Sequence, residues 1–211
     1  QWIGDGMAIG QIYRLGVSQT AAGTYITGLQ DNGSKATSGN VWADNIGGDG
    51  MECIIDYTNA NIQYASASNG KVAITTDGWA TTWDGTTITS NIPGGEKGEW
   101  VTPYIINPNH SDTMFVGYKD LWRTGDYGTT WTKVYTGAAN AGNLKSVAMA
   151  PSNSKCIFIA DSLNHLHKTV DGGANWSLIT GSLPIASSGI TYIAVSDSSP
   201  DTVWVSMGQY N

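Results

Sequence analysis

The chain has 211 residues and a formal net charge of −7, and charged residues make up 13% of it. The absence of any lysine- and arginine-rich stripe argues against nucleic acid as a partner, and no apolar run approaches the roughly 20 residues of a membrane-spanning helix, so no membrane insertion is expected. Nine Trp, ten Tyr and 27 Gly residues, with polar turn residues between short apolar runs, indicate an all-β protein with many turns.

One strand–turn–strand element recurs five times along the chain. Its copies begin at Val17, Ile55, Ile106, Met149 and Val195, at intervals of about 45 residues, the length of a four-stranded propeller blade. Each copy carries an aromatic residue in its second strand: Tyr25, Tyr64, Phe115, Phe158 and Trp204. The sequence therefore predicts a β-propeller of four-stranded antiparallel blades, with about four and a half blades present.

The predicted blade repeats lie near residues 7–46, 47–95, 96–141, 142–186 and 187–211, within a single partial propeller domain that covers residues 1–211. A propeller must close into a ring to remove its sheet edges. We therefore expect a native propeller that is larger than this chain.

Acidic residues precede the predicted innermost strands, whose leading loops face the mouth of a propeller channel. Asp49 lies in a Gly-Gly-Asp-Gly-Met segment that Asp5 partly repeats, while Asp31 and Asn32 lie in a loop of the preceding blade. Glu99 occupies nearly the same place in the blade after that of Asp49, beside Trp100. Paired carboxylates in a cleft are what glycoside hydrolysis requires, so Asp49 is the candidate catalytic residue and the other residues are candidate ligand-binding residues; ordinary Asx-type turns are the structural alternative.

Three turns follow the pattern Ser/Thr-x-Asp-x-Gly-x-Thr-Trp, or Asp-box, at residues 75–83, 124–131 and 169–176. In such a turn the Asp accepts backbone N–H groups, the Gly takes a positive φ and the Trp packs beneath it. We interpret the boxes as structural, and the first as irregular. The structural residues are Asp77, Trp83, Asp126, Gly128, Trp131, Asp171, Gly173 and Trp176.

Other aromatic and metal-ligating residues give weaker signals. Exposed aromatic rings can stack on sugars, and the candidates at the rim or mouth are Trp79, Trp100, Trp122 and Tyr127. Cys53 and Cys156 lie in apolar runs, so we expect buried free thiols. His165 and His167 alternate on a strand without a third ligand. No cofactor and no metal site are therefore expected.

The boxes, together with the segments that begin at Gly28, Gly47 and Ile55, resemble the Asp-box (BNR) repeat propellers, in particular their sortilin-like and glycoside hydrolase family 74-like branch. The chain also looks similar to large secreted bacterial surface proteins that carry a C-terminal sorting domain. The resemblance implies secretion or display at the bacterial cell surface. Xyloglucan-cleaving members of the branch use two Asp residues in a cleft between two propellers; Asp49 is the one position carried over, and the second acid would come from outside this chain.

Three functions remain open at this point. The leading hypothesis is a secreted or surface-displayed propeller module that binds a polysaccharide or an extracellular protein without catalysis in this chain, and that contacts the remaining blades or domains of the same polypeptide. The first alternative is part of a family 74-like endo-β-glucanase or xyloglucanase. The second is a structural spacer in a large surface adhesin.

Overall fold

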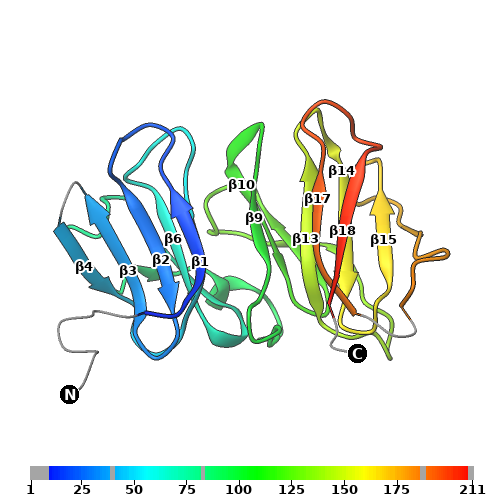
Figure 1. Ribbon diagram of the computed structural model, residues 1–211, viewed down its shortest axis with the longest axis horizontal. Helices are drawn as coiled ribbons and strands as arrows, with labels where there is room; N and C mark the ends of the chain where they lie inside the picture. Colours follow the sequence, from blue (N-terminus) through cyan, green and yellow to red (C-terminus); the bar gives the residue numbers. More distant parts are fainter. Residues whose placement is uncertain (1–9, 39–40, 82–83, 186–188, 209–211) are drawn as a thin grey trace, which may run out of the picture.

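A computed structural model describes residues 10–38, 41–81, 84–185 and 189–208 of the chain. These residues form five antiparallel sheets, four with four strands and one with two. Figure 1 shows the sheets succeeding one another along the long axis, from the N-terminal sheet at the left to the C-terminal sheets at the right. The predicted fold, an all-β partial propeller of about four and a half blades, is confirmed.

Each four-stranded blade is a meander, so strands adjacent in sequence are hydrogen-bonded neighbours in the sheet. The first blade comprises β1 (Ile12–Val17), β2 (Tyr25–Leu29), β3 (Gly33–Ser38) and β4 (Val41–Asn45), and the second β5 (Gly50–Ile55), β6 (Gln63–Ala67), β7 (Lys71–Thr75) and β8 (Thr86–Thr87). The third comprises β9 (Tyr104–Asn107), β10 (His110–Gly117), β11 (Leu121–Thr124) and β12 (Thr132–Tyr135), and the fourth β13 (Leu144–Ala150), β14 (Asn153–Asp161), β15 (Leu166–Thr169) and β16 (Ser177–Leu178). The last sheet contains β17 (Gly189–Val195) and β18 (Val203–Gly208), and two short 3₁₀ helices, η1 (Ser68–Gly70) and η2 (Thr89–Asn91), lie in the second blade. Among the described residues no helix is long and apolar enough to cross a bilayer.

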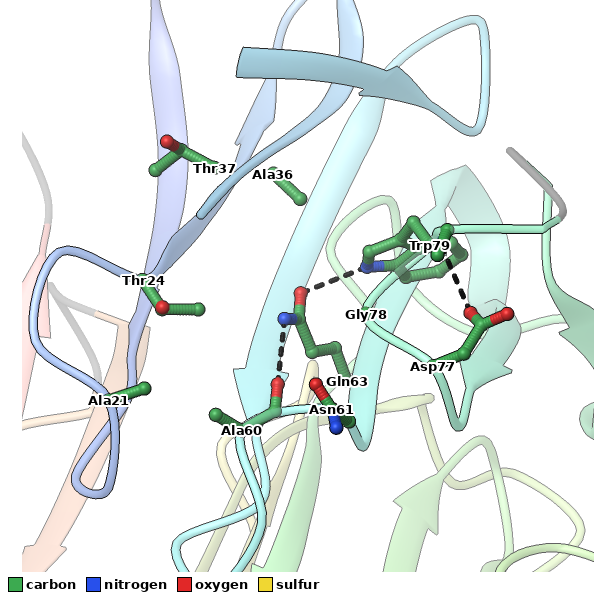
Figure 2. Close-up of a pocket in the computed structure, with 11 residues that line it drawn as sticks. Ala21, Thr24, Ala36, Thr37, Ala60, Asn61, Gln63, Asp77, Gly78 and Trp79 are labelled. Carbon is green, nitrogen blue, oxygen red and sulfur yellow. Dashed lines mark hydrogen bonds between the residues drawn. The ribbon is translucent and has the colours of Figure 1, made fainter. Parts of the chain in front are cut away.

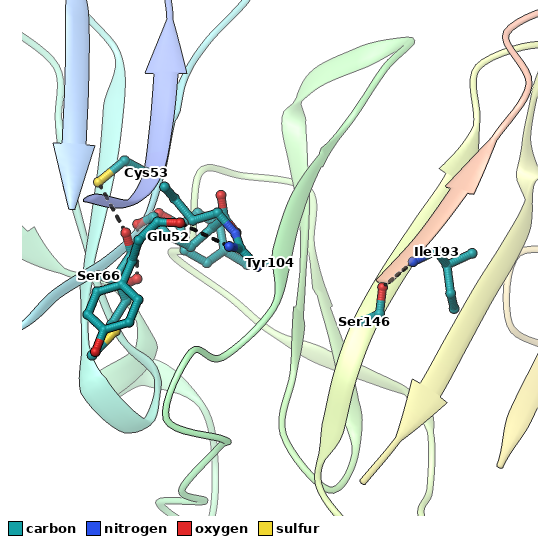
Figure 3. A network of polar contacts seen from close by, with 9 residues as sticks. Glu52, Cys53, Ser66, Tyr104, Ser146 and Ile193 are labelled. Atoms are coloured by element: carbon teal, nitrogen blue, oxygen red, sulfur yellow. Dashed lines mark hydrogen bonds and ion pairs between the residues drawn. The ribbon is translucent and has the colours of Figure 1, made fainter. Parts of the chain in front are cut away.

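The first strands of successive blades contact one another, which places them innermost: β1 with β5, β5 with β9, β9 with β13, and β13 with β17. Polar groups join these inner strands. The Tyr104 hydroxyl donates to the Glu52 carbonyl at 2.7 Å, and the Ile193 N–H donates to Ser146 Oγ at 3.0 Å (Figure 3). These bonds link the second blade to the third and the fourth to the fifth.

The hydrophobic core is divided into layers between neighbouring blades, because alternate side chains of a strand point to opposite sheet faces. Tyr64, Phe115 and Phe158, the repeated aromatic residues of the three inner blades, are at most 3% exposed. In the first blade Ile26 packs against the second blade, whereas the aligned Tyr25 lies on the opposite face and is 37% exposed. A shift of one residue along a strand moves a side chain to the other face of the sheet. The position of the repeated aromatic residue in the first hairpin is therefore shifted by one residue relative to the other repeats.

The second Asp-box turn is held by its own polar side chains. Asp126 accepts hydrogen bonds from the Thr130 N–H at 2.8 Å and from the Thr124 hydroxyl at 2.7 Å, and Thr124 Oγ1 in turn accepts the Gly128 N–H at 2.9 Å. Gly128 has a φ of +87°. The Trp131 indole donates to the Ile88 carbonyl of the preceding blade at 3.1 Å, so the box also fastens two blades together.

The third Asp-box repeats this arrangement. Asp171 accepts the Asn175 N–H at 2.9 Å, Gly173 has a φ of +102°, and the Trp176 indole donates to the Val134 carbonyl of the third blade at 2.8 Å. In the first box Asp77 accepts hydrogen bonds from the Thr75 hydroxyl and from the Thr81 N–H, as its counterparts do. Trp83 lies outside the described residues.

Candidate functional site

The loops that lead into each first strand and the loops that join each second and third strand lie at the same end of an antiparallel blade. We call this end the mouth face, formed in the first two blades by residues 30–32 and 46–49. The β1–β2 and β5–β6 hairpins and the Asp-box turns lie at the other end. Asp31, Asn32, Asp49, Glu99 and Trp100 all belong to mouth-face loops, and Asp5 lies outside the described residues.

Asp49 and Asp31 are brought together at the mouth face. The Asp49 carboxylate accepts the Asp31 N–H at 2.8 Å, which holds Asp31 at a φ of +58°. The same two loops meet through the Gly33 N–H, which donates to the Gly48 carbonyl at 2.6 Å. A Cβ at Gly50 would lie 2.1 Å from the Gly33 carbonyl oxygen, so glycine is required for this approach. The Gly-rich segments at 28–33 and 47–51 are thus two halves of one loop pair.

Trp100 reaches the first blade from a loop of the third. Its indole N–H donates to the Tyr13 hydroxyl at 3.3 Å, and that hydroxyl donates to Gln30 Oε1 at 3.2 Å. The Gln30 carbonyl in turn accepts from Asn32 Nδ2 at 3.0 Å. Trp100 is 49% exposed, so an indole held by its N–H presents its ring to solvent. This is the geometry of an aromatic platform beside polar side chains.

Glu99 is half-buried, and its carbonyl accepts the Thr102 hydroxyl at 2.8 Å. A nearby acid has the more structural role: Glu96 accepts the Trp122 indole N–H at 3.0 Å and the Asp120 N–H at 3.2 Å.

Two tryptophans that the sequence places at the rim or mouth are buried. Trp122 and Trp79 are each only 6% exposed. Both were expected as exposed rim aromatics and that expectation is wrong, because each indole packs between blades and donates its N–H to a neighbouring side chain.

An ion pair at the axis escaped the sequence reasoning. Arg14 Nε lies 3.1 Å from Glu52 Oε2, joining β1 to β5, and the Arg14 guanidinium carbon lies 6.0 Å from the centre of the Tyr192 ring in the last blade. Burial raises the pKa of Glu52, while Arg14 opposes that shift. A hollow of about 30 Å³ beside them is lined by residues of all five sheets, including Lys145. The sequence contained one indication of this pair, because Arg14 and Glu52 are charged residues within two strands predicted to be innermost.

Cys53 and Cys156 lie within β5 and β14, His167 lies on β15, and His165 lies in the mouth-face loop that joins β14 to β15. Cys53 and Cys156 are buried free thiols, as predicted. His165 Nδ1 lies 2.8 Å from the buried Asp161 carboxylate, and His167 Nε2 lies 3.2 Å from the Tyr135 hydroxyl. The described residues contain no group of three or more His, Cys, Asp or Glu side chains arranged to hold a metal ion.

Comparison with known sequences gives a consistent group of relatives. A xyloglucanase of a Paenibacillus species is 28% identical over 144 residues, which covers 54% of this chain and 14% of the relative. The xyloglucanase Xgh74A of Acetivibrio thermocellus is 29% identical over 153 residues, covering 55% of this chain and 18% of the relative. The aligned part is thus less than a fifth of either relative. No protein-family model matches the sequence.

Solved structures match almost the whole chain. An ancestral GH74 enzyme superposes with a TM-score of 0.74 at 15% identity, over 95% of this chain and 28% of that enzyme. The GH74 enzyme of Niastella koreensis gives a TM-score of 0.66 at 21% identity, over 94% and 33% of the two chains. The GH74 xyloglucanase of Xanthomonas campestris gives 0.69 at 16% identity, over 94% and 34%. The chain therefore has the blade architecture of GH74 propellers, and about half of it is similar in sequence to xyloglucanases.

Proposed function

We propose that this chain is part of an extracellular propeller that binds a neutral plant-type β-glucan, such as xyloglucan, at the mouth face. The observation that carries the proposal is Trp100, half exposed and held by its indole N–H to Tyr13. An aromatic ring fixed at its edge offers a flat apolar surface at little entropic cost. The similarity to xyloglucanases supports a polysaccharide over a protein as the ligand.

The polar groups around Trp100 suit sugar hydroxyls. Tyr13, Gln30 and Asn32 supply hydroxyl and amide groups that both donate and accept hydrogen bonds. Asp31 and Asp49 add carboxylate oxygens at the same end of the blades. The net charge of −7 makes a polyanionic glycan a poor ligand for this surface.

Hydrolysis is the second candidate function, and the similarity to xyloglucanases favours it. In that case Asp49 serves as one carboxylate, and the second comes from a part of the protein outside this chain. An inverting glycosidase needs its two carboxyl groups roughly 6.5–9.5 Å apart. Because Asp49 already accepts the Asp31 N–H, its side chain has a fixed position from which such a distance can be measured.

Further blades of the same polypeptide are the proposed protein partner. β18 pairs only with β17 among the described strands, and the face of this last sheet that points away from the fourth blade carries Tyr192 and Trp204, which are 54% and 59% exposed. Leu15 and Val17 on β1 are also more than half exposed. Apolar rows and an open sheet edge of this kind are normally covered in a propeller.

The test is binding of the full chain to soluble xyloglucan, measured by isothermal titration calorimetry and by affinity electrophoresis. Trp100→Ala is expected to weaken binding about tenfold or more, while Trp204→Ala, which removes an even more exposed ring elsewhere, leaves it unchanged. Equal affinity of Trp100→Ala and the unaltered chain contradicts the proposal. Release of reducing ends from xyloglucan by the full-length protein, abolished in Asp49→Asn, establishes the hydrolase function instead.

A further inference from the structure

A hollow between the third and fourth blades gathers basic side chains, at the end of the blades opposite the mouth. It has a volume of about 260 Å³, and its lining includes His110, Arg123 and Lys155. The larger hollow between the first and second blades, which Figure 2 shows, has no Lys, Arg or His among its lining residues. In a chain with a net charge of −7, three basic residues around one hollow are a local excess of positive charge.

Arg123 and Lys155 project from facing sheets into the gap between the two blades. Arg123 on β11 lies opposite Phe115 on β10, and Phe115 packs against residues of the fourth blade. Because opposed residues of antiparallel strands share a sheet face, Arg123 points toward the fourth blade. Lys155 precedes Cys156 on β14, and Cys156 packs toward the last sheet. Adjacent side chains of a strand alternate between faces, so Lys155 points toward the third blade.

The same two repeat positions hold an ion pair one blade later. Lys168 corresponds to Arg123, since each directly precedes the first Thr of an Asp-box. Asp201 corresponds to Lys155, since each lies three positions before the repeated aromatic residue of its blade. Lys168 Nζ lies 2.8 Å from Asp201 Oδ1, which joins the fourth blade to the last sheet. The gap between the third and fourth blades therefore has two cations where the next gap has a cation and an anion.

The acid beside these cations does not pair with them. Among the described residues, none of the ion pairs includes His110, Arg123 or Lys155. Asp171 also lines the hollow, but its carboxylate accepts hydrogen bonds from the Asn175 N–H at 2.9 Å and from Asn175 Nδ2 at 2.7 Å, within its own Asp-box turn. Like charges that face each other across a gap repel, so an anion between them stabilises the arrangement.

Asn107 adds a buried hydrogen-bond donor to the same hollow. The residue is 7% exposed and lines the hollow. Its Oδ1 accepts the Asn109 N–H at 2.9 Å, which fixes the orientation of the amide and leaves its Nδ2 group as a donor. Guanidinium, ammonium and amide N–H groups thus converge here. Such a set of donors matches the acceptor oxygens of an oxyanion.

We propose that this hollow binds an oxyanion group between Arg123 and Lys155, either a free inorganic phosphate or sulfate or the carboxylate of an acidic sugar. The planar guanidinium offers two parallel N–H groups to two oxygens of the anion, and the lysine supplies a second positive charge. The anion takes the place that the Asp201 carboxylate has in the next gap, and so joins the third blade to the fourth. This site is separate from the mouth face and does not depend on the function proposed for it.

The test is isothermal titration calorimetry of the full chain with inorganic phosphate, sulfate and D-glucuronate as separate probes, at one fixed ionic strength. At least one is expected to bind with a dissociation constant of about 1–10 mM, as for other ligands of this size, whereas the neutral D-glucose does not bind. Arg123→Gln is expected to weaken binding about tenfold or more. Lys71→Gln, which removes an exposed charge from β7 of the second blade, is the matched control and leaves binding unchanged.

Lys155→Asp is the second variant, because it rebuilds the charge pair of the next gap. It is expected to abolish anion binding and to raise the melting temperature measured without added anion, so that loss of binding is separated from loss of folding. Binding of D-glucuronate alone identifies an acidic sugar as the source of the oxyanion, and binding of phosphate or sulfate identifies a free anion.

Three results overturn the proposal. The first is no binding of any of the three anions to the folded, unaltered chain, and the second is binding that Lys155→Asp retains. The third is an equal loss of affinity in Arg123→Gln and Lys71→Gln, because the anion is then attracted by overall charge alone. None of these results alters the binding of xyloglucan that Trp100→Ala tests, so the two proposals fail separately.

Discussion

The repeated aromatic residue has different surroundings inside the row of blades and at its end. Phe158 in the fourth blade is 2% exposed because the last sheet packs over it, whereas Trp204, at the same repeat position in that last sheet, is 59% exposed. The two residues belong to one sequence pattern and differ only in whether a further blade covers them. Burial in this fold is therefore supplied by the neighbouring repeat, as expected when no blade covers its own apolar faces.

The largest expected effect is at the covered position. Phe158→Ala should lower the free energy of unfolding by about 4 kcal/mol, since it empties a fully enclosed site between two blades. Urea denaturation followed by tryptophan fluorescence measures it. Trp204→Ala is the control, with an expected change below about 0.5 kcal/mol. Similar losses in the two variants would contradict the distinction between covered and uncovered repeats.

A slightly smaller loss is expected where an Asp-box fastens two blades. Trp131→Ala should lower the free energy of unfolding by about 3 kcal/mol, because the ring is 9% exposed and its indole N–H bonds to the preceding blade. Trp176→Ala, at a half-buried counterpart, should lose roughly half as much. A change under about 1 kcal/mol at Trp131, measured by the same denaturation experiment, would show that the box is not packed between the blades.

Backbone geometry at the second box gives the third prediction. Gly128→Ala should cost about 1–3 kcal/mol, because the residue has a positive φ and a Cβ would lie 2.5 Å from the Ile88 Cβ. Gly172 also has a positive φ, but no atom lies within 4 Å of the Cβ that Gly172→Ala would add. Gly172→Ala should therefore lower the free energy of unfolding by less than Gly128→Ala, and the melting temperatures of the two variants measure the order. Because the positive φ is common to both glycines, the reverse order would show that close contact with Ile88 is not what requires glycine at position 128.

The smallest effect concerns pH. Hydrogen bonds from the Thr130 N–H and from the Thr124 and Thr130 hydroxyls lower the pKa of Asp126, and the corresponding bonds lower the pKa of Asp77 to about 2. A carboxyl whose pKa is lower in the folded state stabilises the fold above its unfolded pKa, near 3.9, and loses that effect as the pH falls through the folded value. Asp126→Asn should therefore be less stable than the unaltered chain at pH 7, with the difference shrinking at pH 2.5.

Urea midpoints at the two pH values measure this difference. Asp197→Asn, in an exposed turn of the last sheet, is the control and should match the unaltered chain at both. A stability difference at Asp126 that is the same at pH 7 and pH 2.5 would show that its ionised carboxylate does not stabilise the turn.

The candidate site could be predicted in part. The glycine-rich segments that carry Asp31 and Asp49 are visible in the sequence because close backbone approach requires glycine, and the structure joins them directly. Trp100 was also recognisable as an aromatic residue in a mouth loop. Its bond to Tyr13, 87 residues away, was not, because it depends on how two non-adjacent blades meet. The same holds for the Arg14–Glu52 pair between β1 and β5.

The fold class followed from the sequence alone, because short apolar runs, turn residues and a period of about 45 residues are local properties that each blade repeats. The tertiary structure alone decided which repeated side chains are buried, since that depends on the presence of a neighbouring blade and on a one-residue register in the first hairpin. It also decided that Trp79, which the sequence pattern predicts as an exposed ring of an irregular turn, is buried between two blades. Local patterns specify strands and turns, whereas only the contact between blades specifies which surfaces remain free to bind.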